Sequence, residues 1–221
     1  MDIPAGLINA PVLLGSVFLL TLLMLVATVT APWAKLKESD NRHVYFGAIV
    51  LLLILWSLRA GISPGQNFHI LGVTALCLMF DWQFALIAAG VVVAGTTLNG
   101  SGSWETFAVN VLLMGALPII LTRVLLYLAQ RFLPHNFYIY IFANAFLAAA
   151  FSSLLTGVAA FLLLSWVDAY PVDVLRQQYL PFLLLMAFPE AFFNGLIMSG
   201  LVVYQPEWVS TFHDRWYLYG K

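Results

Sequence analysis

The sequence predicts an integral membrane protein built from transmembrane helices. Of its 221 residues, 62% are hydrophobic and 9% are charged, and the mean hydropathy is +0.95. A chain of this composition has too little polar surface to cover a water-soluble globule of this size. Apolar stretches close to or above the length that crosses about 30 Å of hydrocarbon recur along the chain. Because these stretches are continuously apolar rather than alternating, they favour helices over the strands of a barrel.

The helix boundaries follow from proline, glycine and charged residues between the apolar runs. The polar segment 32–43 separates the first and second helices, and the breaker string 61–65 precedes the third. That third helix is short, and only Asp81-Trp82-Gln83 separates it from the fourth. The flexible loop 99–103 then leads to the fifth helix, and the polar segment 166–178 separates the sixth and seventh. The predicted spans are residues 10–31, 44–60, 66–81, 83–99, 105–128, 137–166 and 179–204, in one transmembrane domain (1–221) with a cytoplasmic tail at 205–221.

The positive charges predict the orientation, because cytoplasmic loops carry the excess of lysine and arginine. Seven helices with the N-terminus outside leave only Arg59 and Arg176 outside. Omitting the third helix would move Arg123 and Arg131 to the opposite side from the loop at 33–43. We therefore expect an outer N-terminus and a cytoplasmic C-terminus in a multi-pass protein of the bacterial inner membrane. The basic residues on the cytoplasmic side would be Lys35, Lys37, Arg42, Arg123, Arg131, Arg215 and Lys221.

The N-terminus is expected to persist into the mature protein. No basic residue precedes the first apolar run, and no convincing small-residue cleavage site follows it. Because Asp2 is bulky, the initiator methionine should be kept, so the chain would begin with the amine of Met1. The single cysteine, Cys77, cannot form an intrachain disulfide, and we expect it to pack in the bundle.

The candidate functional residues are polar residues inside the membrane or gathered at one face, because ionisable groups in a bilayer usually face a bundle interior or a cavity. The predicted orientation places Met1, Asp2 and His69 at the same outer face. An amine, a deprotonated amide, a carboxylate and an imidazole are all donors that suit Ni(II), Co(II) or Cu(II). The alternative for His69 is that it caps a helix or bonds a loop carbonyl.

Glu190 and Asn194 lie four residues apart, so they share one face of the seventh helix. They would either contact a ligand or form a polar clamp to Asn110 or Asn144 on neighbouring helices. The other histidines are expected to be interfacial or in the tail, on the cytoplasmic side: His43, His135 and His213.

Several function classes are excluded or disfavoured by the sequence. The chain has no nucleophile–base motif, phosphate-binding loop or metalloprotease helix. Its few basic residues exclude a nucleic-acid-binding surface. The balance therefore favours binding or transport over catalysis.

Short motifs along the chain suggest a known family. They are Met1-Asp2-Ile3-Pro4-Ala5-Gly6, Pro64-Gly65 followed by His69-Ile70-Leu71-Gly72, the loop Gly100-Ser101-Gly102, the stretch 108–115, Glu190 near Gly195, and Tyr204-Gln205-Pro206-Glu207. In this order, they resemble the CbiM/NikM family, the substrate-binding membrane components of cobalt and nickel energy-coupling-factor transporters. The resemblance covers nearly the whole chain. It implies a seven-helix substrate-component bundle with an outer N-terminus, which works with a transmembrane coupling subunit and cytoplasmic ATPases.

The resemblance also implies a metal site. In the family, the ion is held by the terminal amine, by the amide and imidazole of a histidine at position two, and by a later histidine. Met1 and His69 carry over directly, but Asp2 stands where the histidine is expected. A carboxylate is a harder ligand, and this should weaken a square-planar nickel site.

We therefore expect a subunit that captures a divalent transition metal (nickel, cobalt or copper) through Met1, Asp2 and His69. Asn110, Glu190 and Asn194 would brace or complete the pocket. Two alternatives remain open. One is a solitary protein of the same fold that acts as a metal-dependent enzyme or as an assembly factor for another membrane complex. The other is a small-molecule binder that uses Glu190 and the aromatic side chains.

Overall fold

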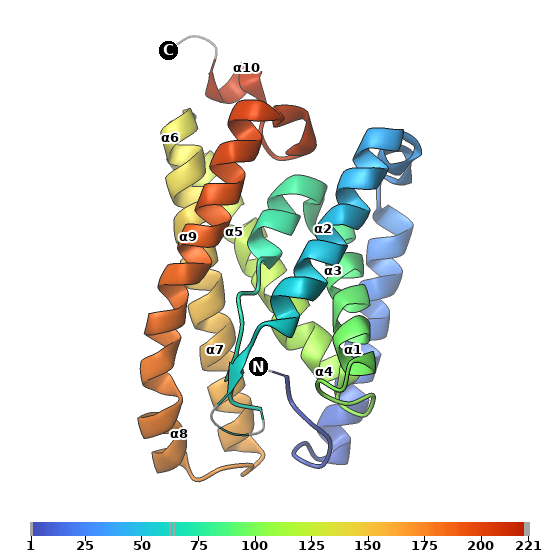
Figure 1. Ribbon diagram of the computed structural model, residues 1–221, viewed down its shortest axis with the longest axis vertical. Coiled ribbons are helices and arrows are strands. Elements are labelled where there is room, and N and C mark those ends of the chain that lie inside the picture. Colours follow the sequence, from blue (N-terminus) through green and yellow to red (C-terminus); the bar gives the residue numbers. More distant parts are fainter. Residues whose placement is uncertain (1, 62, 64, 219–221) are drawn as a thin grey trace.

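The computed structural model describes residues 2–61, 63 and 65–218, and it is a bundle of long helices (Figure 1). The connections alternate between the two ends of the bundle. The helices are α1 (Ala10–Thr30), η1 (Trp33–Lys37), α2 (Ser39–Ser57), α3 (Val73–Leu98), α4 (Phe107–Val111), η2 (Leu112–Ala116), α5 (Leu117–Phe132), α6 (Phe137–Ile139), η3 (Tyr140–Leu147), α7 (Ala148–Trp166), α8 (Val172–Gln178), α9 (Leu180–Tyr204), η4 (Pro206–Trp208) and α10 (Asp214–Tyr217). A short antiparallel pair, β1 (Ala60–Gly61) and β2 (Asn67–Phe68), lies between α2 and α3.

Most predicted spans correspond to helices of the structure. Among the described residues, five helices are long and apolar enough to cross a membrane: Ala10–Thr30, Val73–Leu98, Phe107–Phe132, Phe137–Trp166 and Val172–Tyr204. Their outer faces carry large exposed apolar side chains, such as Phe18 and Val29 on α1. Such a surface suits hydrocarbon and not water. The chain is therefore a polytopic helical membrane protein, although α2 falls outside this set of five and the predicted spans 66–81 and 83–99 share one of them, Val73–Leu98.

The predicted span 66–81 was wrong in extent. Residues 66–72 are not helical, and the helix begins only at Val73. At Asp81, the backbone leaves the helical region (φ 70, ψ 169), and Figure 1 shows the chain reversing direction there. The first half of α3 is thus roughly 12 Å long at 1.5 Å per residue, which is too short to cross the bilayer. Glycine and proline at 61–65 correctly marked a break, but the apolar residues after them form an extended segment.

The C-terminal tail completes this broken helix. The last carbonyls of a helix have no partner within it. Here the Ser210 amide donates to the Met79 carbonyl (3.0 Å), and the Thr211 amide and hydroxyl both donate to the Leu78 carbonyl (3.2 and 2.8 Å). Val209 and Phe212, on either side, are buried. The tail therefore belongs to the folded bundle.

Most of the described basic residues lie at the two ends of the bundle, whereas Arg123 pairs with Asp81 at the reversal of α3. One end holds η1, the connection from α5 to α6, and α10, whereas the other holds the hairpin β1–β2 and α8 (Figure 1). Arg59 and Arg176 belong to the second end. The first end carries Lys35, Lys37, Arg42, Arg131 and Arg215.

Asp81 provides a test of the reversal in α3. Its Oδ1 accepts a hydrogen bond from the Trp82 amide (2.8 Å) and pairs with Arg123 (3.0 Å). Its φ and ψ lie in a region that is essentially restricted to glycine and costs about 1–3 kcal/mol. We expect Asp81→Ala to lower the free energy of unfolding by about 1–3 kcal/mol, because it loses both polar contacts and keeps the strain. Asp81→Gly should lose less, since glycine adopts this conformation freely. Thermal unfolding in detergent measures both, and a glycine variant less stable than the alanine variant would contradict the backbone argument.

Candidate metal centre

The N-terminal segment is inserted into the bundle as a fixed element. Ile3 is fully buried. Its amide donates to Oδ1 of Asn110 (2.9 Å), while Nδ2 of Asn110 donates back to its carbonyl (3.1 Å). The Thr106 hydroxyl donates to the same carbonyl. The side-chain amide of Asn110 therefore pairs with the Ile3 peptide much as a neighbouring strand would.

Gly102 allows this close approach. It has a φ of +76°, and a Cβ placed on it would lie 3.1 Å from Nδ2 of Asn110. A side chain here would therefore disturb the amide that holds Ile3. The loop at 99–103, which the sequence predicted to be flexible, has a positional role.

Asp2 lies beside Ile3 and is also buried, at 5% exposure. Its amide donates to Oδ1 of Asn67 on β2 (2.8 Å). Its carboxylate pairs with Arg59 (3.1 Å), and Nδ2 of Asn67 donates to the same oxygen (3.3 Å). The carboxylate expected to contact a metal is thus paired with a cation in this structure.

His69 lies in the extended segment between β2 and α3, and not at the start of a helix as the span 66–81 implied. Its ring packs on Trp56, with centroids 4.7 Å apart, and its Nδ1 lies 3.3 Å from the Ile70 carbonyl. Its Nε2 is buried and has no hydrogen-bond partner among the described residues. Buried polar atoms without a partner are uncommon and call for an explanation such as a missing ion. Burial also lowers the pKa of His69 to about 4, so the imidazole is neutral near pH 7 and able to bind a metal.

Glu190 and Asn194 fix the backbone that follows His69. Glu190 accepts from the amides of Leu71 (2.6 Å) and Gly72 (2.8 Å). Asn194 accepts from the Ala75 amide (2.8 Å) and donates to Glu190 (2.8 Å). Together they supply partners for the amides at the start of α3, which a helix cannot satisfy itself. The pair is a clamp between α9 and the backbone of α3.

The structure brings several of the predicted site residues into one region. Asn110 holds Ile3 next to Asp2, and the Glu190 clamp lies two residues from His69. Met1 lies outside the described residues. Within the described part of the chain, no three His, Cys, Asp or Glu side chains form a group that could hold a metal. A metal here would therefore need backbone or terminal nitrogen as well as side chains.

Sequence reasoning missed three polar residues in this region. Arg59 was used only as a charge for topology, and Asn67 was not considered. Gln66 is fully buried, and neither its Oε1 nor its Nε2 has a partner among the described residues. All three belong to the stretch between α2 and α3, where polar residues adjoin a break in an apolar sequence. Polar residues beside a break in an apolar sequence were the signal from which these three residues could have been found.

Comparisons with known proteins agree with this architecture. A family model described as the cobalt uptake substrate-specific transmembrane region, CbiM, matches residues 2–208. A solved structure of a truncated transition metal transporter has a TM-score of 0.76 at 15% identity, covering 92% of this chain and 99% of that chain. A second structure, of a transition metal transporter, has a TM-score of 0.75 at 15% identity, covering 91% and 92%. At this identity, the structures show a shared fold alone. No curated protein matches the sequence.

Asn110 offers a test of the inserted segment. Asn110→Ala leaves the buried amide of Ile3 without its acceptor, which costs about 1–3 kcal/mol. We therefore expect the variant to unfold at a lower temperature than the wild-type protein. Asn144→Ala is a matched control, because Asn144 is equally buried but its Oδ1 has no hydrogen-bond partner among the described residues. Equal losses in both variants would argue against a specific role for the Asn110–Ile3 pair.

Glu190 offers a test of the clamp. Glu190→Ala leaves the amides of Leu71 and Gly72 unpaired, so it should cost about 2–5 kcal/mol of unfolding free energy. Glu190→Gln keeps one acceptor oxygen and should lose less. The exposed Asp173→Ala controls for removal of an acidic side chain. If Glu190→Ala unfolds at the same temperature as the control in detergent, the clamp is not needed to hold α3.

Proposed function

Because this chain belongs to the CbiM family of cobalt uptake substrate-specific transmembrane regions, we propose that it is the substrate-binding membrane subunit of a transition-metal uptake transporter. The family match, over residues 2–208, confirms the resemblance inferred from the short motifs. The two structures with the same fold are described as transition metal transporters. The substrate of this chain would be a divalent ion of the nickel or cobalt kind.

The observation that carries the proposal is the imidazole of His69. It is buried and packs on Trp56, while its Nε2 has no hydrogen-bond partner within the described chain. A neutral imidazole nitrogen is a common ligand for nickel, cobalt and copper. The Glu190 clamp fixes the backbone two residues further on, and this limits the freedom of the imidazole before the ion arrives.

The N-terminus would supply the other ligands. The hydrogen bonds of Ile3 with Asn110 fix the chain within two residues of the terminal amine. Metal binding through the Asp2 amide would require loss of its proton, and Asn67 would then have to turn its amide group so that it donates there. The carboxylate of Asp2 would have to leave Arg59 to reach an ion. We infer that Asp2 contributes less binding energy than a histidine at this position would.

The partners follow from the family and from the chain itself. The sequence carries no nucleotide-binding motif, and the family acts as one component of a multi-subunit transporter. We propose a transmembrane coupling subunit and cytoplasmic ATPases as partners. The end of the bundle with more basic residues would face the cytoplasm, which places the N-terminal segment and His69 towards the outside.

Metal analysis of purified protein tests this proposal. Protein with its native N-terminus, from cells supplied with nickel or cobalt, should contain close to one metal ion per chain. His69→Ala should lower the affinity for the ion by about tenfold or more, because one good ligand contributes at least about 1.4 kcal/mol, and it should therefore lower the metal content. One glycine added before Met1 should also reduce it, since the added residue converts the amine of Met1 into a peptide nitrogen.

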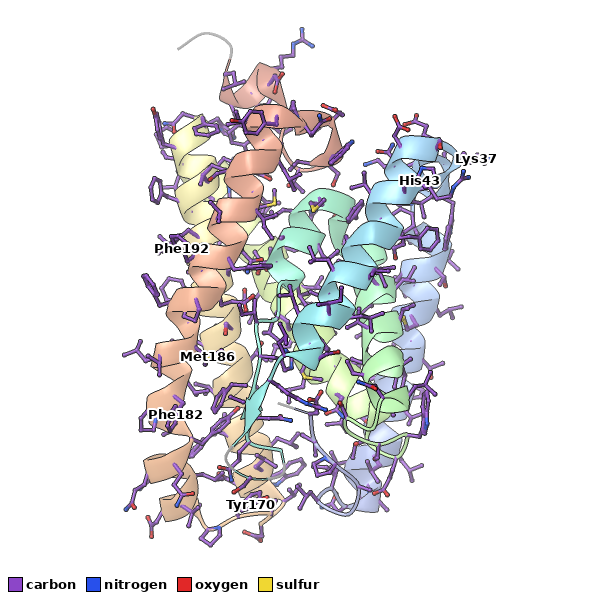
Figure 2. All side chains as sticks on the ribbon, viewed as in Figure 1. Lys37, His43, Tyr170, Phe182, Met186 and Phe192 are labelled. Carbon is purple, nitrogen blue, oxygen red and sulfur yellow. The ribbon has the colours of Figure 1, made fainter. Side chains whose placement is uncertain are left out.

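The matched control is His43→Ala. His43 is exposed near Lys37, at the opposite end of the bundle from Tyr170 (Figure 2). This variant should keep its metal. Protein that contains no metal, or a metal content that His69→Ala leaves unchanged, would reject the proposal.

A further inference from the structure

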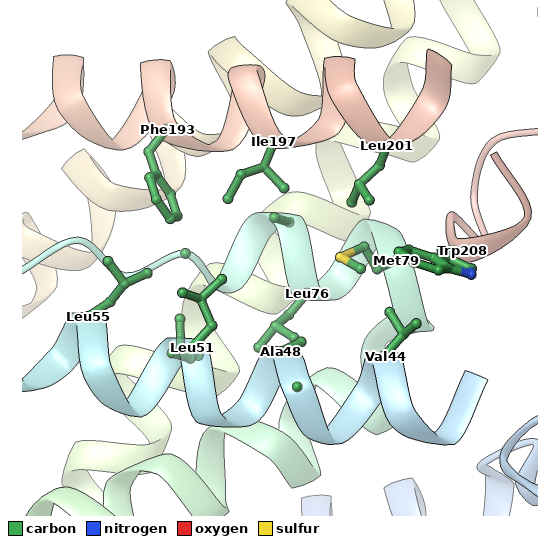
Figure 3. Close-up of a pocket in the computed structure, with 14 residues that line it drawn as sticks. Val44, Ala48, Leu51, Leu55, Leu76, Met79, Phe193, Ile197, Leu201 and Trp208 are labelled. Atoms are coloured by element: carbon green, nitrogen blue, oxygen red, sulfur yellow. The ribbon is translucent and has the colours of Figure 1, made fainter. Parts of the chain in front are cut away.

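A groove runs between α2 and α9, and Gly72, whose amide Glu190 holds, also lines it. Figure 3 shows Phe193, Ile197 and Leu201 of α9 on one side, facing Leu51 and other residues of α2. The first half of α3 contributes Leu76 and Met79. The groove has a volume of about 250 Å³, and its lining is almost entirely apolar. One wall of the groove is α9, which belongs to a helix long and apolar enough to cross a membrane, so hydrocarbon is its natural surrounding.

Small residues create this space. Gly47 and Ala48 on α2 line the groove, as does Ala75 on α3. A Cβ placed on Gly47 meets no atom within 4 Å. The groove is therefore open where a side chain would otherwise stand, and a larger residue at position 47 would occupy it without a clash.

A polar cavity adjoins one end of the groove. It has a volume of about 260 Å³ and shares Met79 and Trp208 with the groove. Lys35, Glu38 and Glu207 also line it. Tryptophan is enriched at the level of lipid headgroups. The two cavities together thus offer an apolar channel that ends in a mouth with charges of both signs.

The size of the groove selects the kind of occupant. One turn of an α-helix, roughly 5.4 Å long and 10–12 Å across, takes up about 400–600 Å³. The groove has only about 250 Å³, so it cannot enclose a partner helix. A cavity of about 150 Å³ accepts a benzene-sized molecule, and the groove is larger. An extended alkyl chain fits an elongated apolar space of this volume.

We propose that the groove and the adjoining cavity form a binding site for one phospholipid with a zwitterionic head that carries a primary ammonium group. One acyl chain would lie along α2 and α9. Lys35 would face the phosphate, and Glu38 and Glu207 would face the ammonium group. Both charges of the lipid head then have partners of opposite sign. A singly anionic head, by contrast, would leave two carboxylates facing a phosphate.

Native mass spectrometry of the detergent-purified full chain tests the site with two lipids that carry the same palmitoyl and oleoyl chains. We expect one phosphatidylethanolamine to remain bound, in preference to phosphatidylglycerol. Gly47→Leu should weaken this binding by about tenfold, which corresponds to the loss of roughly two buried methylene groups. Gly200→Leu is the matched control, because a Cβ at Gly200 also meets nothing within 4 Å and this residue does not line the groove.

The mouth is tested separately. Glu207→Gln should remove the preference for phosphatidylethanolamine, whereas Lys37→Ala, an exposed neighbour outside the cavity, should keep it.

Wild-type protein that binds neither lipid, or binding unaffected by Gly47→Leu, would overturn the proposal. Equal binding of both lipids would overturn the assignment of the head. If Gly47→Leu releases a coupling subunit while no lipid is ever bound, the groove is a protein contact instead. None of these readouts depends on metal.

Discussion

The fold depends on one constraint: backbone amides and carbonyls inside a bilayer need partners within the protein. The first half of α3 begins and ends inside the bundle, so both its ends would leave such groups unpaired. Glu190 and Asn194 satisfy the amides at its start, and Ser210 and Thr211 satisfy the carbonyls at its end. A short helix buried at this depth is stable because two distant parts of the chain supply these partners.

The same constraint explains the candidate metal centre. The extended chain at 66–72 and the N-terminal segment are non-helical, so their peptide groups also need side-chain partners. Asn110 and Asn67 supply them. Non-helical backbone at membrane depth occurs where it is buried in protein or lines a cavity. Here it holds His69 and the buried residues Asp2 and Ile3, and Nε2 of His69 has no hydrogen-bond partner among the described residues.

Much of this architecture could be predicted from the sequence. Continuous apolar runs located the long helices, because length and composition alone decide whether a helix can span a bilayer. The breaker string 61–65 correctly marked a discontinuity. The start of α3 was not predictable in this way, since an apolar sequence such as 68–72 suits both a buried helix and a buried extended segment. Spacing on one helix face paired Glu190 with Asn194, but it could not identify their partners, which are backbone amides at the start of α3 and just before it. Arg59 was missed because its role depends on a carboxylate far away in the sequence, at Asp2.

The clamp on α3 has a consequence for biogenesis. Glu190 lies 119 residues after Leu71, and Thr211 lies 133 residues after Leu78. When the ribosome has just made the region 59–81, its partners do not yet exist. This region must therefore wait at the membrane surface, where water satisfies its peptide groups, while the flanking helices insert. It enters the bundle only after α9, Ser210 and Thr211 have been synthesised. Insertion of this part of the chain is thus late, because its hydrogen-bond partners are made more than a hundred residues after it.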